Sequence, residues 1–205
     1  MLDLPSKPAA PQPLRLKRQL KTLSLAAYVR QEARQEDKHE FHDGILVKKP
    51  YTRGPHNEIT LNITFALKTA LRNQNSPVRL FSGDQKIYLP EVNFGLYPDV
   101  VALSGDPVYW DDDTLLLINP PLVVEVLSRS TGPYDRSSKF DLYKTRPTFQ
   151  EYMLVRQDAY EVETRYREAP GLWRETVTQG LEGEVHLRSL ACSIRMADIY
   201  EHIRL

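Results

Sequence analysis

Two acidic side chains and one amine near the middle of the chain have the types and spacing that phosphate chemistry requires. Asp99 lies in the apolar run 97–103, Glu125 lies in the apolar run 120–128, and Lys139 follows in a segment with helical spacing. Apolar runs of this length, rich in Val and Leu, predict strands that are buried on both faces. An ionised carboxylate in such a strand is unfavourable unless a positive charge meets it, so Glu125 requires a partner.

The alternation of side chains along a strand predicts how the two acids are oriented. Glu125 shares a face with Val123 and Leu127, and Asp99 shares a face with Val101. If the two strands are neighbours, the carboxylates of Asp99 and Glu125 converge at one point. Two carboxylates a few ångströms apart repel each other, and a bound cation would remove that repulsion.

The chemistry that this arrangement would support is phosphodiester hydrolysis. Mg²⁺ accepts one or two carboxylates together with water and substrate phosphates, and Mn²⁺ suits similar oxygen ligands. A metal held by Asp99 and Glu125 would polarise a phosphoryl oxygen, generate hydroxide and stabilise the leaving oxygen. Lys139 would orient the attacking water or stabilise the charge that develops on phosphorus. The sequence thus predicts Asp99, Glu125 and Lys139 as catalytic residues, with the two acids as metal ligands.

Each of these three residues also has an interpretation without catalysis. Glu125 and Lys139 together would form a buried ion pair. Asp99 follows Pro98 and would cap the start of its strand. Lys139, taken alone on a helix, would extend its ammonium group to the surface.

Three further side chains are secondary candidates for the same site. His56 at an expected helix start would donate to a phosphate or orient water, or serve only as an N-terminal polar residue. Glu40 would reach the metal as a further acid, although a solvated strand position is the preferred interpretation for it. Asp135 lies one turn before Lys139, and an i,i+4 ion pair is favoured over a catalytic role.

The elements that must position these residues follow from periodicity and turn signals. Asp43-Gly44 between two short alternating runs predicts a hairpin over 40–47. Gly132, Pro133 and Pro147 delimit a helix over 131–146. Further helices are expected over 24–37, 56–74 and 195–203. Residues 78–89 are strand-like with a break at 82–84, and an antiparallel set of strands is expected over 151–155, 160–166, 172–178 and 184–187. Residues 104–119 form an acidic loop, whose Asp111–Asp113 run is expected to be a solvated surface.

Length and composition predict one globular domain. The chain has 205 residues, of which 41% are hydrophobic, so a sizeable core is possible. Its 27 basic and 27 acidic residues cancel, which gives no overall attraction to nucleic acid. Any basic groove must therefore be local, and Lys48, Lys49 and Arg53 near His56 are the candidates.

The N-terminal segment and the single cysteine bound the remaining possibilities. Residues 1–21 are basic and punctuated by four prolines, which predicts a flexible tail before a domain over 22–205. Cys192 as the only cysteine excludes an internal disulfide and a cysteine metal cluster. No apolar run is long enough to span a bilayer and no signal-peptide pattern is present, so we expect a cytoplasmic location.

Several stretches together resemble the Uma-two family, a restriction-endonuclease-like group of the PD-(D/E)XK superfamily. The resemblance covers about residues 24–203. The stretches are Pro98-Asp99-Val100, the run Pro121 to Ser128 with Ser130-Thr131, Asp135-Arg136 and Lys139, with weaker support from Glu40, Asp43-Gly44, His56 and Glu151-Tyr152.

The resemblance implies a fold and the roles of particular residues. The fold would be α+β with an α/β core, a restriction-endonuclease-like mixed β-sheet flanked by helices. Asp99 would be the aspartate of the PD element and Glu125 the acid of the (D/E)XK element. The superfamily lysine lies two residues after that acid, where this chain has Leu127, and Lys139 on the following helix would supply the ammonium group instead.

Three functional hypotheses follow. The first is an Mg²⁺-dependent (or Mn²⁺-dependent) endonuclease that hydrolyses DNA, without an organic cofactor or a membrane partner, and a homodimer because double-strand cutting usually requires two sites. The second is a catalytically inactive module that keeps the fold for binding nucleic acid or protein, which Leu127 favours. The third is a structural unit in which Asp99, Glu125 and Lys139 form a buried ionic network.

Overall fold

The structure is a computed structural model that describes residues 22–73, 77–110 and 116–205. The expected tail over 1–21 and the Asp111–Asp113 run lie outside the described residues. In the described ranges no helix is both long enough and apolar enough to cross a membrane.

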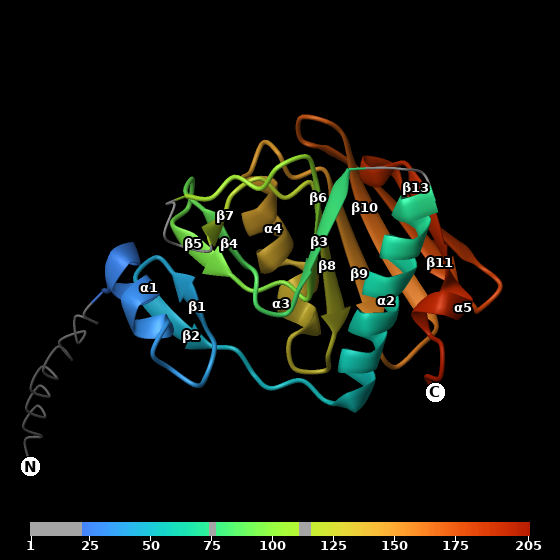
Figure 1. The fold of residues 1–205 in the computed structure, drawn as a ribbon, viewed down its shortest axis with the longest axis horizontal. Coiled ribbons are helices and arrows are strands. Elements are labelled where there is room, and N and C mark those ends of the chain that lie inside the picture. The colour runs from blue at the N-terminus through green and yellow to red at the C-terminus, as the bar shows by residue number, and fades with distance from the viewer. Residues whose placement is uncertain (1–21, 74–76, 111–115) are drawn as a thin grey trace, which may run out of the picture.

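A mixed six-stranded sheet with the order β11-β10-β9-β8-β6-β3 forms the centre of the fold (Figure 1). β8 and β9 run parallel, and all other neighbours in this sheet run antiparallel. Every residue of β8 is buried, as its continuous apolar sequence predicts for a central strand. The strands are β3 (Val78–Ser82), β6 (Val100–Ser104), β8 (Leu122–Leu127), β9 (Glu151–Arg156), β10 (Glu161–Ala169) and β11 (Leu172–Gln179).

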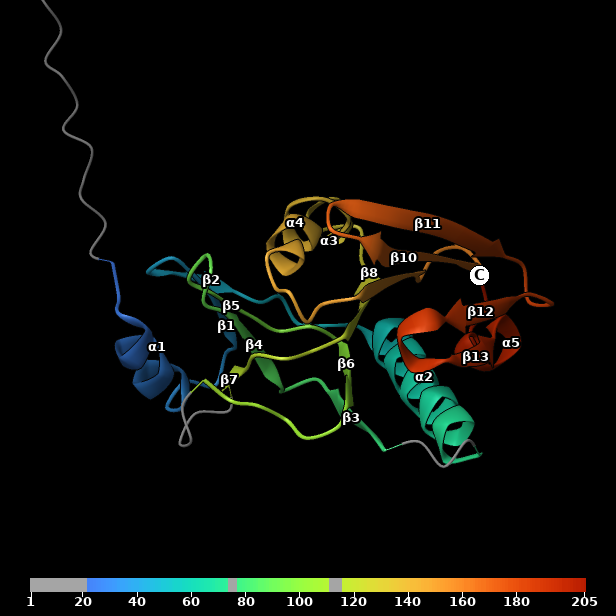
Figure 2. The same cartoon turned by 90° about the horizontal axis from the view of Figure 1, so that it is seen from above.

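Different helices cover the two faces of this sheet (Figure 2). On one face α2 (Gly54–Asn73) packs Ile63 and Leu67 against Val124 of β8, together with the hairpin of β12 (Glu184–Leu187) and β13 (Cys192–Arg195) and with α5 (Met196–Ile199). On the other face α3 (Gly132–Arg136) precedes α4 (Ser138–Lys144), whose Phe140 and Tyr143 belong to the same core cluster as Val123. Successive residues of β8 thus serve two separate cores, as strand alternation requires.

A second sheet, with the order β2-β1-β5-β4-β7, extends the second core. The predicted hairpin is present, and its turn residues Asp43 and Gly44 have φ values of 44° and 92°. A left-handed conformation at both positions suits an Asp-Gly turn between twisted strands. The strands of this sheet are β1 (His39–His42), β2 (Ile45–Lys48), β4 (Lys86–Leu89), β5 (Phe94–Leu96) and β7 (Leu116–Leu117), and helix α1 (Leu25–Glu32) precedes β1.

The α+β class with mixed sheets flanked by helices is confirmed, and several element boundaries require correction. The helix expected over 131–146 is two helices, because Ser137 leaves helical geometry (φ −121°, ψ −91°) and its hydroxyl donates to the Pro133 carbonyl at 2.6 Å. A serine that bonds the backbone of the preceding turn competes with the helix in this way. The strand expected over 97–103 begins only at Val100, since Pro98 has no N–H to donate.

The C-terminal expectations were partly wrong. The residues of β12 do not join the antiparallel set but pair with β13, a strand that the sequence analysis did not anticipate. The last helix, α5, ends at Ile199, and His202 adopts a φ of 63°. The Tyr200 hydroxyl donates to the Arg156 carbonyl at 2.8 Å. This hydrogen bond holds the chain against the sheet, where the sequence predicted a longer helix. The first helix also ends early, at Glu32, whose carboxylate accepts the N–H of His39 at 2.7 Å.

Candidate active site

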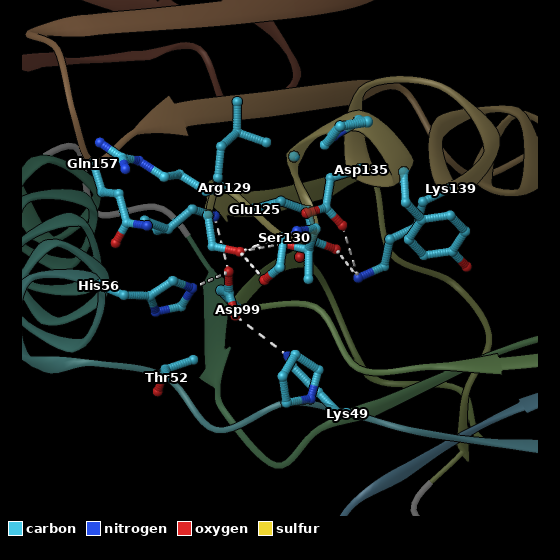
Figure 3. A pocket seen from close by; sticks show the side chains of 18 of the residues that line it. Lys49, Thr52, His56, Asp99, Glu125, Arg129, Ser130, Asp135, Lys139 and Gln157 are labelled. Atoms are coloured by element: carbon cyan, nitrogen blue, oxygen red, sulfur yellow. Dashed lines mark hydrogen bonds and ion pairs between the residues drawn. The ribbon is translucent and has the colours of Figure 1, made fainter.

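Lys139 places a buried ammonium group at the centre of the candidate site (Figure 3). Its side chain starts in the first turn of α4, and its Nζ atom lies 2.8 Å from Glu125 Oε1. The same Nζ lies 3.4 Å from Glu40 Oε1 and 3.6 Å from Asp135 Oδ1. The interpretation of Lys139 as a surface side chain is wrong, since the residue is only 3% exposed and carboxylates from three different elements surround it.

Asp99 lies directly before β6, between Pro98 and the first strand residue, Val100. Its Oδ2 accepts the N–H of Val126 in β8 at 2.8 Å and lies 3.0 Å from Nε2 of His56. Its Oδ1 lies 3.3 Å from Nζ of Lys49, in the segment after β2. His56 is in the first turn of α2, so the helix brings its N-terminal end to the ends of the strands. Asp99 therefore both anchors its strand to β8 and presents a charge to the site.

Glu40 is also part of the cluster, and its preferred interpretation as a solvated residue is wrong. It is 6% exposed in β1, and its Oε1 accepts the N–H of Tyr97 at 3.3 Å. Its Oε2 lies 3.0 Å from Nε2 of His42, which shares its face of the hairpin. The second sheet thus delivers Glu40 to Lys139 from the side opposite to Glu125.

The sequence analysis did not predict the contacts that two residues, Lys49 and Tyr143, make in the site. Lys49 was considered only as a contributor to a basic groove, but its Nζ donates to the Tyr97 carbonyl at 2.7 Å as well as approaching Asp99. Lys48, its neighbour, turns away and pairs with Asp37 at 2.6 Å. The hydroxyl of Tyr143 donates to Glu125 Oε1 at 3.3 Å, a contact that the sequence analysis did not predict. The only sequence signal for Lys49 was that neighbouring strand residues point to opposite faces. That signal does not say whether Lys48 or Lys49 points into the site.

The two carboxylates proposed as metal ligands have opposite acid–base character. Burial alone would raise the pKa of Asp99, but the hydrogen bond to His56 and the charge of Lys49 outweigh it, so that pKa lies well below its usual range. Burial raises the pKa of Glu125 to about 8, since the ammonium group of Lys139 only partly opposes it and neighbouring carboxylates reinforce it. At neutral pH and without a further cation, Asp99 is ionised and Glu125 tends to hold a proton.

The remaining members of the cluster follow the same electrostatic logic. Burial of Glu40 is outweighed by the charge of Lys139 and the hydrogen bond to His42, which bring its pKa down to about 2. Burial raises the pKa of Asp135, with Lys139 opposing it. Burial would lower the pKa of Lys139 itself, but the carboxylates of Glu125, Glu40 and Asp135 outweigh it, so this lysine stays charged.

These residues form the wall of a large pocket of about 1070 Å³ between α2, β8, α3 and the segment that follows β2. Buried acids and cationic side chains line it together, as Figure 3 shows for Asp99 and Glu125 and for Lys49 and Arg129. The cationic lining, which we call the rim, can contact a polyanion. The cationic lining residues are Lys48, Lys49, Arg53, Arg129, Arg136 and Arg156.

A divalent cation fits the chemistry of the donor set. In the described part of the chain, no group of three or more His, Cys, Asp or Glu side chains is placed to hold a metal ion. Mg²⁺ does not need one, because it keeps several waters and takes only one or two carboxylates. The carboxylates of the cluster outnumber its ammonium groups, so the cluster would attract a further cation. The carboxylates are Glu40, Asp99, Glu125 and Asp135, and the ammonium groups are Lys49 and Lys139.

His56 has one unsatisfied nitrogen in the wall of the pocket. Its Nε2 contacts Asp99, whereas Nδ1 is buried and, among the described residues, finds no hydrogen-bond partner. A buried unpaired ring nitrogen is unfavourable until water or a ligand fills the position. His56 therefore has the geometry to hold Asp99 with one nitrogen and to contact a ligand with the other.

Comparisons with known proteins show which family and which fold this chain shares. The Uma2 family model, described as "Putative restriction endonuclease", matches residues 25–197. The uncharacterized protein slr1290 of Synechocystis is 32% identical over 180 residues, which are 87% of this chain and 91% of that protein. A second Synechocystis protein, sll1609, is 30% identical over 80% of this chain and 92% of its own length. A crystal structure from Anabaena variabilis, titled a "putative nuclease belonging to DUF820", has the same fold with a TM-score of 0.66, 16% identity and coverage of 83% of this chain and 93% of that one.

Proposed function

The chain belongs to the Uma2 family of restriction-endonuclease-like proteins, and from that premise we propose that it is a metal-dependent endonuclease that hydrolyses DNA phosphodiester bonds. Mg²⁺ is the proposed metal and Mn²⁺ the alternative. The observation that carries the proposal is the convergence of Asp99, Glu125 and Lys139 from three elements, with Lys139 Nζ 2.8 Å from Glu125. These three are the proposed catalytic residues, and Asp99 and Glu125 are the proposed metal ligands.

The metal and the protein side chains would divide the chemistry between them. A divalent cation in such a site polarises the phosphoryl oxygen and lowers the pKa of water. Asp99 is ionised and held in one orientation by Val126 and His56, so it is ready to bind a cation. Lys139 remains charged and would lie beside the phosphate, where a fixed ammonium group stabilises the negative charge that develops during hydrolysis.

DNA is the proposed substrate because the pocket combines buried acids with a cationic rim. The chain has no net charge, so the attraction would come from the local lysines and arginines rather than from the whole molecule. Contacts of this kind go mainly to phosphates, and DNA binding should therefore weaken steeply as the salt concentration rises.

An inactive binding module is the second candidate, and one observation favours it. Both oxygens of Asp99 already have partners, with Lys49 on one and His56 and Val126 on the other. Leu127 also stands where the superfamily places its lysine. A protein with this site could bind DNA through the rim without cutting it.

Nicking of supercoiled plasmid, with and without Mg²⁺ or Mn²⁺, tests the proposal. Asp99→Asn and Glu125→Gln keep the size of each side chain and remove its charge, so both should abolish metal-dependent nicking. Glu151→Gln is the matched control, because Glu151 is a buried strand glutamate outside this pocket. The wild type and this control should nick. Binding of DNA without nicking by the wild type would support the inactive module, and nicking that survives both site substitutions would refute the assignment of the site.

A further inference from the structure

The outer side of α2 carries a strip of side chains that the fold itself does not use. Glu58, Leu61, Phe65 and Lys68 are all exposed and follow one another at spacings of three, four and three residues. This spacing places them along one side of a helix as a continuous row, which we call the α2 strip. Leu61 is 67% exposed and Phe65 is 74% exposed, although both residue types favour burial.

Two other sides of α2 are in contact with the rest of the protein. Ile59, Ile63 and Leu67 are buried in the core beneath the sheet. On one flank, the side-chain amide of Asn62 donates to the carbonyls of Ile199 at 3.2 Å and Glu201 at 2.9 Å. Figure 2 shows α2 at the periphery of the fold, with α5 and β13 beside it. The α2 strip therefore faces outward, and its two apolar residues, Leu61 and Phe65, are not part of the protein core.

The two charges at the ends of the strip are available for an external contact. Among the residues that the structure describes, neither Glu58 nor Lys68 has an ion-pair partner. The edge strand β11 offers a contrast. It also exposes two apolar side chains, Leu172 and Val177, but its charged residues already have partners within the chain, such as Glu175 with Arg165 at 3.3 Å.

We propose that the α2 strip is the contact surface between two copies of this chain, whose α2 helices pack antiparallel about a two-fold axis beside residue 63. In that arrangement, residues equally far from position 63 face each other. Leu61 then meets the partner's Phe65, and Glu58 meets the partner's Lys68. The two-fold axis repeats each of these contacts, as an isologous interface requires.

The charges select both the partner and the direction of packing. A parallel arrangement would place Glu58 against the partner's Glu58 and Lys68 against the partner's Lys68, which is repulsive. The antiparallel arrangement pairs opposite charges at both ends and keeps the apolar residues in the middle, as in antiparallel helix pairs generally. A strip that is complementary to itself fits a second copy better than an unrelated protein. Since one helix pair buries less surface than a standard interface, we expect dissociation at micromolar concentrations.

Sedimentation velocity of the full chain, over about 1 to about 500 µM, tests the dimer. The wild type should show a concentration-dependent dimer. Leu61→Gln combined with Phe65→Gln should remain monomeric over the whole range, since glutamine is a good helix former and removes only the apolar contact. The matched control is Leu172→Gln combined with Val177→Gln, which should dimerise like the wild type. A wild type that stays monomeric at every concentration, or a dimer that persists in the α2 variant, would overturn the proposal.

Charge reversal tests the antiparallel pairing independently. Glu58→Lys and Lys68→Glu, each alone, place like charges opposite each other at both ends and should each weaken the dimer about tenfold or more. The two substitutions together restore opposite charges and should return the dissociation constant to within about threefold of the wild type. Additive weakening in the double variant would contradict this pairing. All six positions are exposed, and circular dichroism should confirm that the variants keep their helix content.

Discussion

Two glutamates lie in adjacent parallel strands of the same sheet, equally hidden from solvent, but in different surroundings. Glu125 in β8 is 2% exposed and Glu151 in β9 is 0% exposed. Glu125 points to the face that α4 covers. Glu151 lies opposite Leu122 in the register and points to the other face, toward the turn that follows β12.

The two sites differ in what surrounds the carboxylate. Glu151 accepts the N–H of Ser189 at 2.9 Å, its hydroxyl at 2.6 Å and the N–H of Arg188 at 3.1 Å, all neutral donors of one short turn. Glu125 is held by the ammonium group of Lys139 and the phenol of Tyr143, close to other carboxylates and beside a large pocket. Burial is therefore no guide to function here. Neutral backbone donors indicate a structural carboxylate, whereas shared cations and neighbouring acids indicate a site that can bind a metal.

The largest expected effect comes from removing the buried ammonium group beside Glu125. Lys139→Met should lower the free energy of unfolding by about 3–5 kcal/mol at neutral pH, because it leaves several buried carboxylates without their ammonium partner. The loss should shrink at acid pH, where those carboxylates can take up protons. Urea denaturation measures both. Lys144→Met in the same helix removes a more exposed pair with Asp141 and a cation–π contact 4.8 Å from the centre of the Phe140 ring, so it should change stability by less than about 1 kcal/mol. Equal effects of the two substitutions would contradict this account.

A smaller loss of stability, with no loss of function, is expected on the other face. Glu151→Gln should lower the free energy of unfolding by about 1–3 kcal/mol, because the new NH₂ group faces donors that need an acceptor. Plasmid nicking should be unchanged. Glu184→Gln in the exposed part of β12 is the control and should leave stability within about 0.5 kcal/mol of the wild type. A nicking defect in a folded Glu151→Gln variant would contradict the purely structural role of Glu151.

The fold class and the central triplet could be predicted because their signals are local. Continuous apolar runs predict central strands, and one acid in such a run, followed by a helix with a lysine in its first turn, places Glu125 near Lys139. The alternation that put Glu125 on one face is confirmed. The convergence of Asp99 with that region depended on β6 and β8 being neighbours, which the sequence analysis assumed and the structure shows.

The remaining features depend on contacts between distant segments, which a single sequence does not contain. Glu40 looks like a solvated strand residue until the second sheet packs against α4 and buries it beside Lys139. Lys48 and Lys49 are alike in sequence, and only the tertiary fold sends one to Asp99. The break at Ser137 arises because a side-chain hydrogen bond to the preceding turn overrides the helical pattern.

The smallest expected effect is a gain in stability, and it is expected when Glu125 itself is replaced. Glu125→Gln should abolish nicking yet raise the free energy of unfolding at neutral pH, by on the order of 1 kcal/mol. On folding, wild-type Glu125 must either take up a proton or bury its charge, and glutamine avoids both costs, while Lys139 keeps Glu40 and Asp135 as partners.

The pH dependence gives this last prediction its sign. Burial raises the pKa of Glu125 from 4.5 to about 8, so the folded state binds more protons than the unfolded state between those values. The wild type should therefore lose stability as the pH rises from about 4.5 to about 8, and Glu125→Gln should flatten that part of the curve. Urea denaturation across this range, without divalent cations, measures the difference between the two proteins, which should be small at the acid end and grow toward the alkaline end. A difference that stays constant would mean that Glu125 is ionised throughout and that Lys139 neutralises it fully, as in a purely structural ion pair.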